Sequence, residues 1–146
     1  MSFDYPKRIR FICDRCAICC GDTKDRTRAI LLLKLEAYRI SKKTSKSVEG
    51  FAEEIRGREP YSYKMKKRGN GKCVFLKEDN LCAVYHIRPL VCSFYPFELK
   101  EARNGKHTFA HTNECPCIGK GPELRRSYFE KLFQETAKLT KQDSYR

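Results

Sequence analysis

The feature that most constrains the fold of this chain is a run of four cysteines spaced C-x2-C-x2-C-C: Cys13, Cys16, Cys19 and Cys20. Two residues between cysteines let a turn direct successive sulfur atoms at one point, and thiolate sulfur is a preferred ligand of zinc and of iron–sulfur clusters. Five more cysteines follow at a distance: Cys73, Cys82, Cys92, Cys115 and Cys117. A tight cluster completed by distant cysteines predicts a chain that folds around metal.

The alternative explanation for so many cysteines is a framework of disulfides. Three observations speak against it. The sequence opens without an apolar signal segment, so nothing indicates an oxidising compartment. The count of nine is odd. Neighbouring Cys19 and Cys20 pair only with difficulty, because adjacent side chains on an extended chain point apart. We therefore predict thiolates in a reducing cytoplasm, with an inert buried thiol as an alternative for one of the nine.

Length and charge set the outer limits of the prediction. A chain of 146 residues predicts one domain over residues 1–146. The apolar run 29–33 ends at Lys34, far short of the ~20 residues that a membrane span requires. The formal net charge is +13, and eight thiolates around two dipositive centres would lower it to about +9. That excess predicts an acidic protein or a nucleic acid as partner.

The patterning predicts an α+β fold, a small irregular metal-stapled domain with short β-hairpins, short helices and a C-terminal helix. The C-terminal helix is expected at about 122–142, starting at Pro122, with an apolar stripe of Leu124, Tyr128, Leu132, Phe133 and Ala137. Residues 103–105 read as a hairpin turn. The other expected elements are a strand over 28–33, helices over 34–40 and 48–56, strands near 61–63 and over 73–76, a helical turn within 81–89, and strands over 97–100 and 106–110.

The order of the cysteines and of their neighbours resembles a known family. After the N-terminal run come Cys73 before an apolar pair, then Cys82-x2-Tyr85-x2-Arg88-Pro89-x2-Cys92, Tyr95-Pro96 and Cys115-Pro116. This order is similar to that of the CxxCxxCC zinc- or iron-chelating domain family, the YkgJ-like cysteine-cluster proteins, over about residues 11–119. Related domains look like part of flagellin lysine methylases. The resemblance implies a metal binder or an iron–sulfur oxidoreductase, and it says little about activity.

The resemblance also implies a set of metal ligands. Carried over residue by residue, the ligands are Cys13, Cys16, Cys19, Cys20, Cys73, Cys82, Cys92 and Cys115. Cys117 stands where the family has the glycine of Cys-Pro-Gly, and it is a spare thiol or a substitute ligand, with the spare thiol favoured. Ala17 replaces a glycine that is usual in the family. The Arg-Pro-x2-Cys context favours Arg88 as a residue that offsets thiolate charge beside the metal.

Eight thiolates divide naturally into two centres of four. Cys13, Cys16 and Cys19 could share one centre, with Cys20 facing the other. Zinc sites usually combine two C-x2-C pairs, and this chain lacks a second pair. Three cysteines in x2 succession with a remote Cys-Pro come closer to the bacterial ferredoxin run. We therefore favour a [4Fe–4S] cluster, with zinc as the alternative.

The remaining motifs are weaker. His107 and His111 read as surface side chains, because the thiols already supply enough ligands. Residues 64–68 are basic and lie beside Tyr61 and Tyr63, which would suit a nucleic-acid patch, but a solvated hairpin is favoured. Phosphate-binding loops, nucleophile elbows and paired catalytic acids are absent from the sequence.

Three functions follow, in order of preference. The first is an iron–sulfur protein for electron transfer or for cluster or metal supply. The second is a structural zinc module that binds a protein or RNA. The third is an accessory component of a redox or methyl-transfer enzyme. No independent catalytic activity is expected, and a protein partner is favoured over a nucleic acid and over a membrane.

Overall fold

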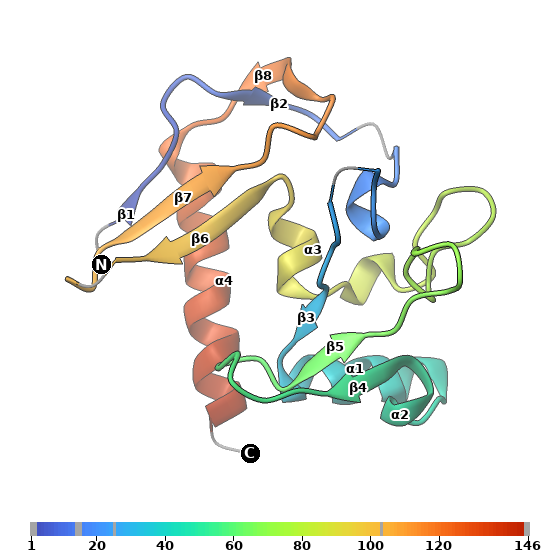
Figure 1. Ribbon diagram of the computed structural model, residues 1–146. Helices are drawn as coiled ribbons and strands as arrows, with labels where there is room; N and C mark the ends of the chain where they lie inside the picture. Colours follow the sequence, from blue (N-terminus) through green and yellow to red (C-terminus); the bar gives the residue numbers. More distant parts are fainter. Residues whose placement is uncertain (1–2, 14–15, 25, 103, 145–146) are drawn as a thin grey trace. The chain divides into compact units, whose positions relative to one another are not determined.

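The computed structural model describes residues 3–13, 16–24, 26–102 and 104–144 (Figure 1). The chain forms two compact units. The first unit comprises residues 1–14 and 94–136, and the second comprises residues 15–93 and 137–146. Helices and small sheets occur together and a helix ends the chain, so the α+β prediction is confirmed. The single domain over residues 1–146 stays a prediction.

The first unit contains two small sheets and the start of a long helix. In one sheet β1 pairs in parallel with β7, which pairs antiparallel with β6; in the other, β2 pairs antiparallel with β8 in an irregular register. The predicted hairpin is confirmed as β6 and β7, and Arg103 in its turn lies outside the described residues. The elements are β1 (Phe3–Asp4), β2 (Arg10–Phe11), β6 (Phe97–Glu101), β7 (His107–His111), β8 (Ile118–Glu123) and α4 (Arg126–Ser144).

Aromatic rings form the core of the first unit. Phe129 of α4 is fully buried, and its ring lies 4.9 Å from that of Phe97 and 5.2 Å from that of Phe109. Phe133, one turn further along α4, stacks on Phe3 at 5.2 Å. Figure 1 shows this part of α4 running behind β6 and β7. Each such ring pair contributes about 0.5–1.5 kcal/mol beyond the area that it buries.

Helix α4 begins at Arg126 rather than at Pro122. Pro122 lies in β8, and Leu124 N–H donates to the carbonyl of Ile9 at 2.8 Å, which keeps this segment extended. The pairing of β8 with β2 therefore outweighs the preference of proline for the first turn of a helix. The predicted stripe also omitted Phe129, the most deeply buried residue of the helix.

The second unit contains a three-stranded antiparallel sheet, in the order β3-β5-β4, with α1 and α2 beside it (Figure 1). Its core joins apolar side chains of these elements with Cys73, and Cys20, Cys82 and Cys92 pack against that core. The elements are the 3₁₀ helix η1 (Ile18–Cys20), β3 (Leu31–Leu32), α1 (Lys34–Thr44), α2 (Val48–Phe51), β4 (Ala52–Glu54), β5 (Tyr63–Met65), the 3₁₀ helix η2 (Tyr85–Ile87) and α3 (Leu90–Phe94).

Three expected elements of the second unit differ in the structure. The helix expected over 48–56 ends at Phe51, because the next residues form β4 and pair with β5. The strand expected over 73–76 is a series of turns with isolated bridges from Cys73 to Lys67 and from Leu76 to Cys82. The strand expected over 28–33 is only β3. In the described part of the chain, no helix is both long and apolar enough to cross a membrane.

Candidate metal centre

Five thiols of the second unit gather around one apolar core, because Cys73 belongs to that core, Cys20, Cys82 and Cys92 pack against it, and Cys19 adjoins Cys20. The sulfur atoms of Cys19 and Cys20 are 4.0 Å apart. Cys19, Cys73 and Cys82 each act on the pKa of Cys92, and Cys82 and Cys92 each act on that of Cys20. All five side chains carry free thiols. We call Cys19, Cys20, Cys73, Cys82 and Cys92 the five-thiol cluster; it brings together five of the eight predicted ligands.

Backbone pairing holds the Cys19–Cys20 turn against the segment that carries Cys73. Cys73 N–H donates to the carbonyl of Cys20 at 2.6 Å, and Gly21 forms an antiparallel bridge with Lys72. A Cβ atom on Gly21 would lie 2.4 Å from the carbonyl oxygen of Gly71 and 2.7 Å from the Cα of Lys72. Only glycine fits this approach, so the residue after the double cysteine fixes where both sulfurs lie relative to Cys73.

Turns after β5 position the next pair of thiols. Phe75 N–H points to the sulfur of Cys73 at 3.4 Å, and Ala83 N–H donates to the carbonyl of Phe75 at 2.8 Å. The bridge between Leu76 and Cys82 closes this turn, which brings the segment of Cys82 back beside that of Cys73.

A buried carboxylate holds the helix that carries the fifth thiol. Glu36 is 5% exposed; its Oε1 accepts from Leu33 N–H at 2.9 Å and its Oε2 accepts from Leu90 N–H at 2.7 Å. One side chain thus accepts hydrogen bonds from the backbone at the starts of both α1 and α3, and α3 carries Cys92. Burial raises the pKa of Glu36, and the two N–H donors oppose that shift.

Two arginines lie near the five-thiol cluster. Arg28 donates from Nε to the carbonyl of Cys19 and from a terminal nitrogen to the carbonyl of Val91, both at 3.1 Å. Arg88 donates to the carbonyl of Tyr85 at 3.1 Å and lies 4.1 Å over that ring. Burial raises the pKa of Cys92 and Cys82, and the charges of Arg28 and Arg88 respectively oppose part of that rise; both arginines also help to lower the pKa of Cys19. The charge-offsetting role predicted for Arg88 stays a prediction, and Arg28 was not foreseen.

The thiols differ in how readily they lose a proton. The hydrogen bond shared with Cys20 lowers the pKa of Cys19 to about 6, with a further contribution from Arg28. The same hydrogen bond raises the pKa of Cys20, with burial adding to it. Burial is the first cause that raises the pKa of the other three thiols, Cys73, Cys82 and Cys92. Metal binding at this cluster must therefore release protons.

The chemistry of the five-thiol cluster fits a thiophilic metal. Its donors are soft sulfur atoms, which select zinc and iron–sulfur clusters over magnesium or calcium. Among the residues that the structure describes, no three cysteine, histidine or acidic side chains already stand in a ligating arrangement. A bound metal would thus draw converging thiols together rather than enter a closed cage.

Comparison with known proteins agrees with this chemistry. The family described as "CxxCxxCC: Putative zinc- or iron-chelating domain" matches residues 12–118. The chain belongs to the CxxCxxCC family. It is also similar to "Uncharacterized protein MJ0661" of Methanocaldococcus jannaschii, with 29% identity over 117 residues, which cover 76% of this chain and 58% of that protein. The chain thus spans little more than half the length of this relative. No solved structure matches the chain.

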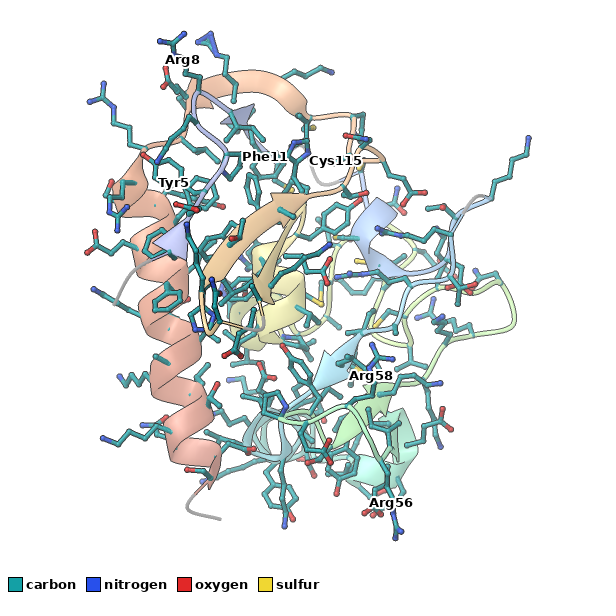
Figure 2. All side chains as sticks on the ribbon, turned by 60° about the vertical axis from the view of Figure 1, so that its left-hand side comes forward. Tyr5, Arg8, Phe11, Arg56, Arg58 and Cys115 are labelled. Carbon is teal, nitrogen blue, oxygen red and sulfur yellow. The ribbon has the colours of Figure 1, made fainter. Side chains whose placement is uncertain are left out.

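The CxxCxxCC match includes all nine cysteines. Cys16 is exposed in the second unit, and Cys13 is exposed in the first unit. Cys115, labelled in Figure 2, and Cys117 are buried in the first unit, after β7. Asp14 and Arg15, within the N-terminal run, lie outside the described residues. The ligand roles of Cys13, Cys16 and Cys115 stay predictions, as does the spare role of Cys117.

The basic hairpin residues are engaged within the protein. Lys66 and Arg68 donate to backbone carbonyls at 2.5 Å and 3.0 Å, and Lys67 pairs with Asp22 at 2.6 Å. The neighbouring tyrosines are half-buried (Tyr61 and Tyr63). These contacts favour the solvated hairpin over a nucleic-acid patch.

The two histidines of β7 belong to the first unit, whereas the residues of the five-thiol cluster belong to the second. The ring of His107 contacts that of Phe133 edge to face, 5.1 Å between centroids. His111 is exposed, with Nδ1 3.2 Å from the carbonyl oxygen of Thr112.

Proposed function

We propose that this chain binds metal at the five-thiol cluster of its second unit, and that the metal is held as an iron–sulfur cluster, with [4Fe–4S] as the favoured form. The observation that carries metal binding is that Cys20, Cys82 and Cys92 pack against the core that contains Cys73, with the sulfur of Cys19 4.0 Å from that of Cys20, although these cysteines come from segments far apart in the sequence. Iron–sulfur is favoured on the spacing of Cys13, Cys16 and Cys19, which is closest to the bacterial ferredoxin run, although only Cys19 of these three belongs to the five-thiol cluster. The function is electron transfer or the supply of clusters or metal.

A four-coordinate centre takes four thiolates. In the proposed assignment Cys73, Cys82 and Cys92 supply three of them, because each stands alone on its own segment. The fourth comes from the adjacent pair Cys19 and Cys20, whose sulfurs are close enough to substitute for one another.

The proposed setting is the reducing cytoplasm, where five free thiols persist. The proposed partner is an acidic protein, because the chain carries a formal net charge of +13. Opposite charge accelerates the encounter of two proteins and makes its rate depend on salt.

One distance favours a second candidate, a structural zinc module that binds a protein or RNA. Two thiolates on the same tetrahedral zinc, each about 2.3 Å from the metal, lie roughly 3.8 Å apart. The sulfurs of Cys19 and Cys20 lie 4.0 Å apart. If both bind metal, this distance suits two ligands of a single zinc ion.

Metal analysis and a visible spectrum of anaerobically purified protein test both candidates. Brown protein with bound iron and sulfide, lost in Cys92→Ser and kept in the neighbouring control Ser93→Ala, supports the iron–sulfur proposal. Colourless protein with stoichiometric zinc that Cys92→Ser removes supports the zinc candidate. Protein without bound iron or zinc, or with metal that survives Cys92→Ser, overturns the assignment of the centre.

A further inference from the structure

Arg28 connects two segments that carry members of the five-thiol cluster. Its Nε donates to the carbonyl of Cys19, and its terminal nitrogen donates to the carbonyl of Val91, the residue before Cys92. Arg28 and Val91 are 63 positions apart in the sequence. A single guanidinium therefore spans from the double-cysteine turn to helix α3.

The base of the Arg28 side chain is itself held in place. Its backbone N–H donates to Oδ1 of Asp22 at 2.7 Å, and Lys67 pairs with the same oxygen at 2.6 Å. Asp22 in turn follows Gly21, the residue packed against the backbone beside Cys73. The guanidinium thus extends from an anchored backbone, and its planar fork sets the separation of the two carbonyls.

We propose that Arg28 is the positioning residue of the metal centre: it holds the backbone of the Cys19–Cys20 turn beside that of α3, so that a metal can draw their sulfurs together. The inference rests on the function proposed above. Arg88 does not duplicate this role, because its hydrogen bond goes to Tyr85, within its own turn. A lysine at position 28 would keep the charge but lacks the fork that reaches both carbonyls.

The positive charge of Arg28 would also stabilise a metal–thiolate centre. Four thiolates around one dipositive ion leave a net charge of roughly −2. The guanidinium of Arg28 faces the segments of Cys19 and Cys92, where it offsets part of that charge. Residues that orient metal ligands in this way typically change metal affinity by ~10–100-fold when they are replaced.

The test titrates Co²⁺ into the metal-free full-length chain, since cobalt–thiolate absorption reports how many sulfurs bind each ion. Arg28→Met should weaken Co²⁺ binding by ~10–100-fold and lower the thiolate absorption per bound ion. Arg28→Lys should fall between wild type and Arg28→Met. The control is Arg56→Met, whose exposed side chain points away from the second unit in Figure 2 and which should match wild type. A residue that only supports the fold would leave the spectrum of the bound ion unchanged.

Two outcomes overturn the inference, and a third overturns the function beneath it. If Arg28→Met or Arg28→Lys binds Co²⁺ with the same affinity and the same spectrum as the control Arg56→Met, Arg28 does not position the metal ligands. If Arg28→Met fails to fold, the measurement on folded Arg28→Lys tests the inference, because lysine lacks the planar guanidinium that donates to both carbonyls. Cys92→Ser, measured in parallel, distinguishes failure of the metal centre from failure of the positioning role. Full Co²⁺ binding in Cys92→Ser refutes the metal centre itself. Loss of binding in Cys92→Ser, together with normal binding in the Arg28 variants, refutes only the positioning role.

Discussion

Replacing Gly21 by alanine should separate the double-cysteine turn from Cys73. The added Cβ would lie 2.4 Å from the carbonyl oxygen of Gly71 and 2.7 Å from the Cα of Lys72. Both neighbours are backbone atoms, so no side chain can rotate away to make room. The two segments must move apart, which stretches the 2.6 Å hydrogen bond from Cys73 N–H to the carbonyl of Cys20.

The cost of Gly21→Ala follows from these contacts. Forcing one extra carbon into a packed site costs typically about 1–3 kcal/mol. The hydrogen bonds beside it, Cys73 N–H to Cys20 and Asp22 N–H to Gly71, are each worth about 1 kcal/mol net. With partial loss of both, we expect the free energy of unfolding to fall by about 3 kcal/mol. The displaced sulfurs should also lower the metal bound per chain.

Urea unfolding of metal-free protein and metal analysis of purified protein measure these two effects. Gly69→Ala is the matched control, because nothing lies within 4 Å of a Cβ at Gly69. If Gly21→Ala unfolds at the urea concentration of Gly69→Ala and binds as much metal, then the close approach at Gly21 does not position the cysteines, and the account of the docked turn is wrong.

Four further predictions concern a buried acid, the two late cysteines, the basic hairpin and the metal itself. Burial raises the pKa of Glu36 above its ordinary 4.5, so the native state binds more protons than the unfolded state, and the contribution of Glu36 to stability is lost as pH rises through the raised value. Glu36→Gln should remove this fall from a plot of unfolding free energy against pH. The variant should also lower stability by about 1–3 kcal/mol, because the amide nitrogen cannot accept a backbone N–H. Cys115→Ser should lower bound metal and Cys117→Ser should not, and equal losses by metal analysis would mean that the ligand set is wrong. Neutralising residues 66–68 should reduce RNA affinity only in proportion to charge, and a Tyr63→Ala change that costs ~1–3 kcal/mol of binding would restore the nucleic-acid reading. Removing metal with a chelator should expose amides of the second unit to hydrogen exchange, and unchanged exchange of those amides would contradict this.

Local sequence patterns predicted the parts of the fold that local chemistry decides. The β6–β7 hairpin follows from alternating strands around Asn104-Gly105, and Gly105 adopts the left-handed conformation that such a turn needs. Strand β4 was missed because the helix predicted over 48–56 included its residues, which instead pair with β5, and β8 was missed because it exists only through pairing with β2, which is far away in the sequence. The start of α4 was misplaced for the same reason, since pairing with β2 holds Pro122 in a strand.

The candidate site shows the same division. The type and spacing of the cysteines predicted which residues could bind metal, and the structure brings five of these cysteines together in the second unit. The residues that arrange them gave no sequence signal: Arg28 matters through two backbone carbonyls, and Glu36 matters through Leu90, 54 positions away. Gly21 offered a hint, as a glycine directly after the double cysteine, but its necessity depends on the approach of Lys72.

The five-thiol cluster and the apolar core of the second unit share residues, and this links metal binding to folding. Cys73 is 6% exposed within that core, and Cys20, Cys82 and Cys92 pack against it. Without metal, burial disfavours the thiolate form of Cys73, Cys82 and Cys92, so each stays protonated and packs as a small apolar side chain. In the proposed metal centre, the same sulfurs lose their protons and cross-link the segments that carry them. The core therefore tolerates both states, and the metal adds its binding free energy to a unit that is already partly packed.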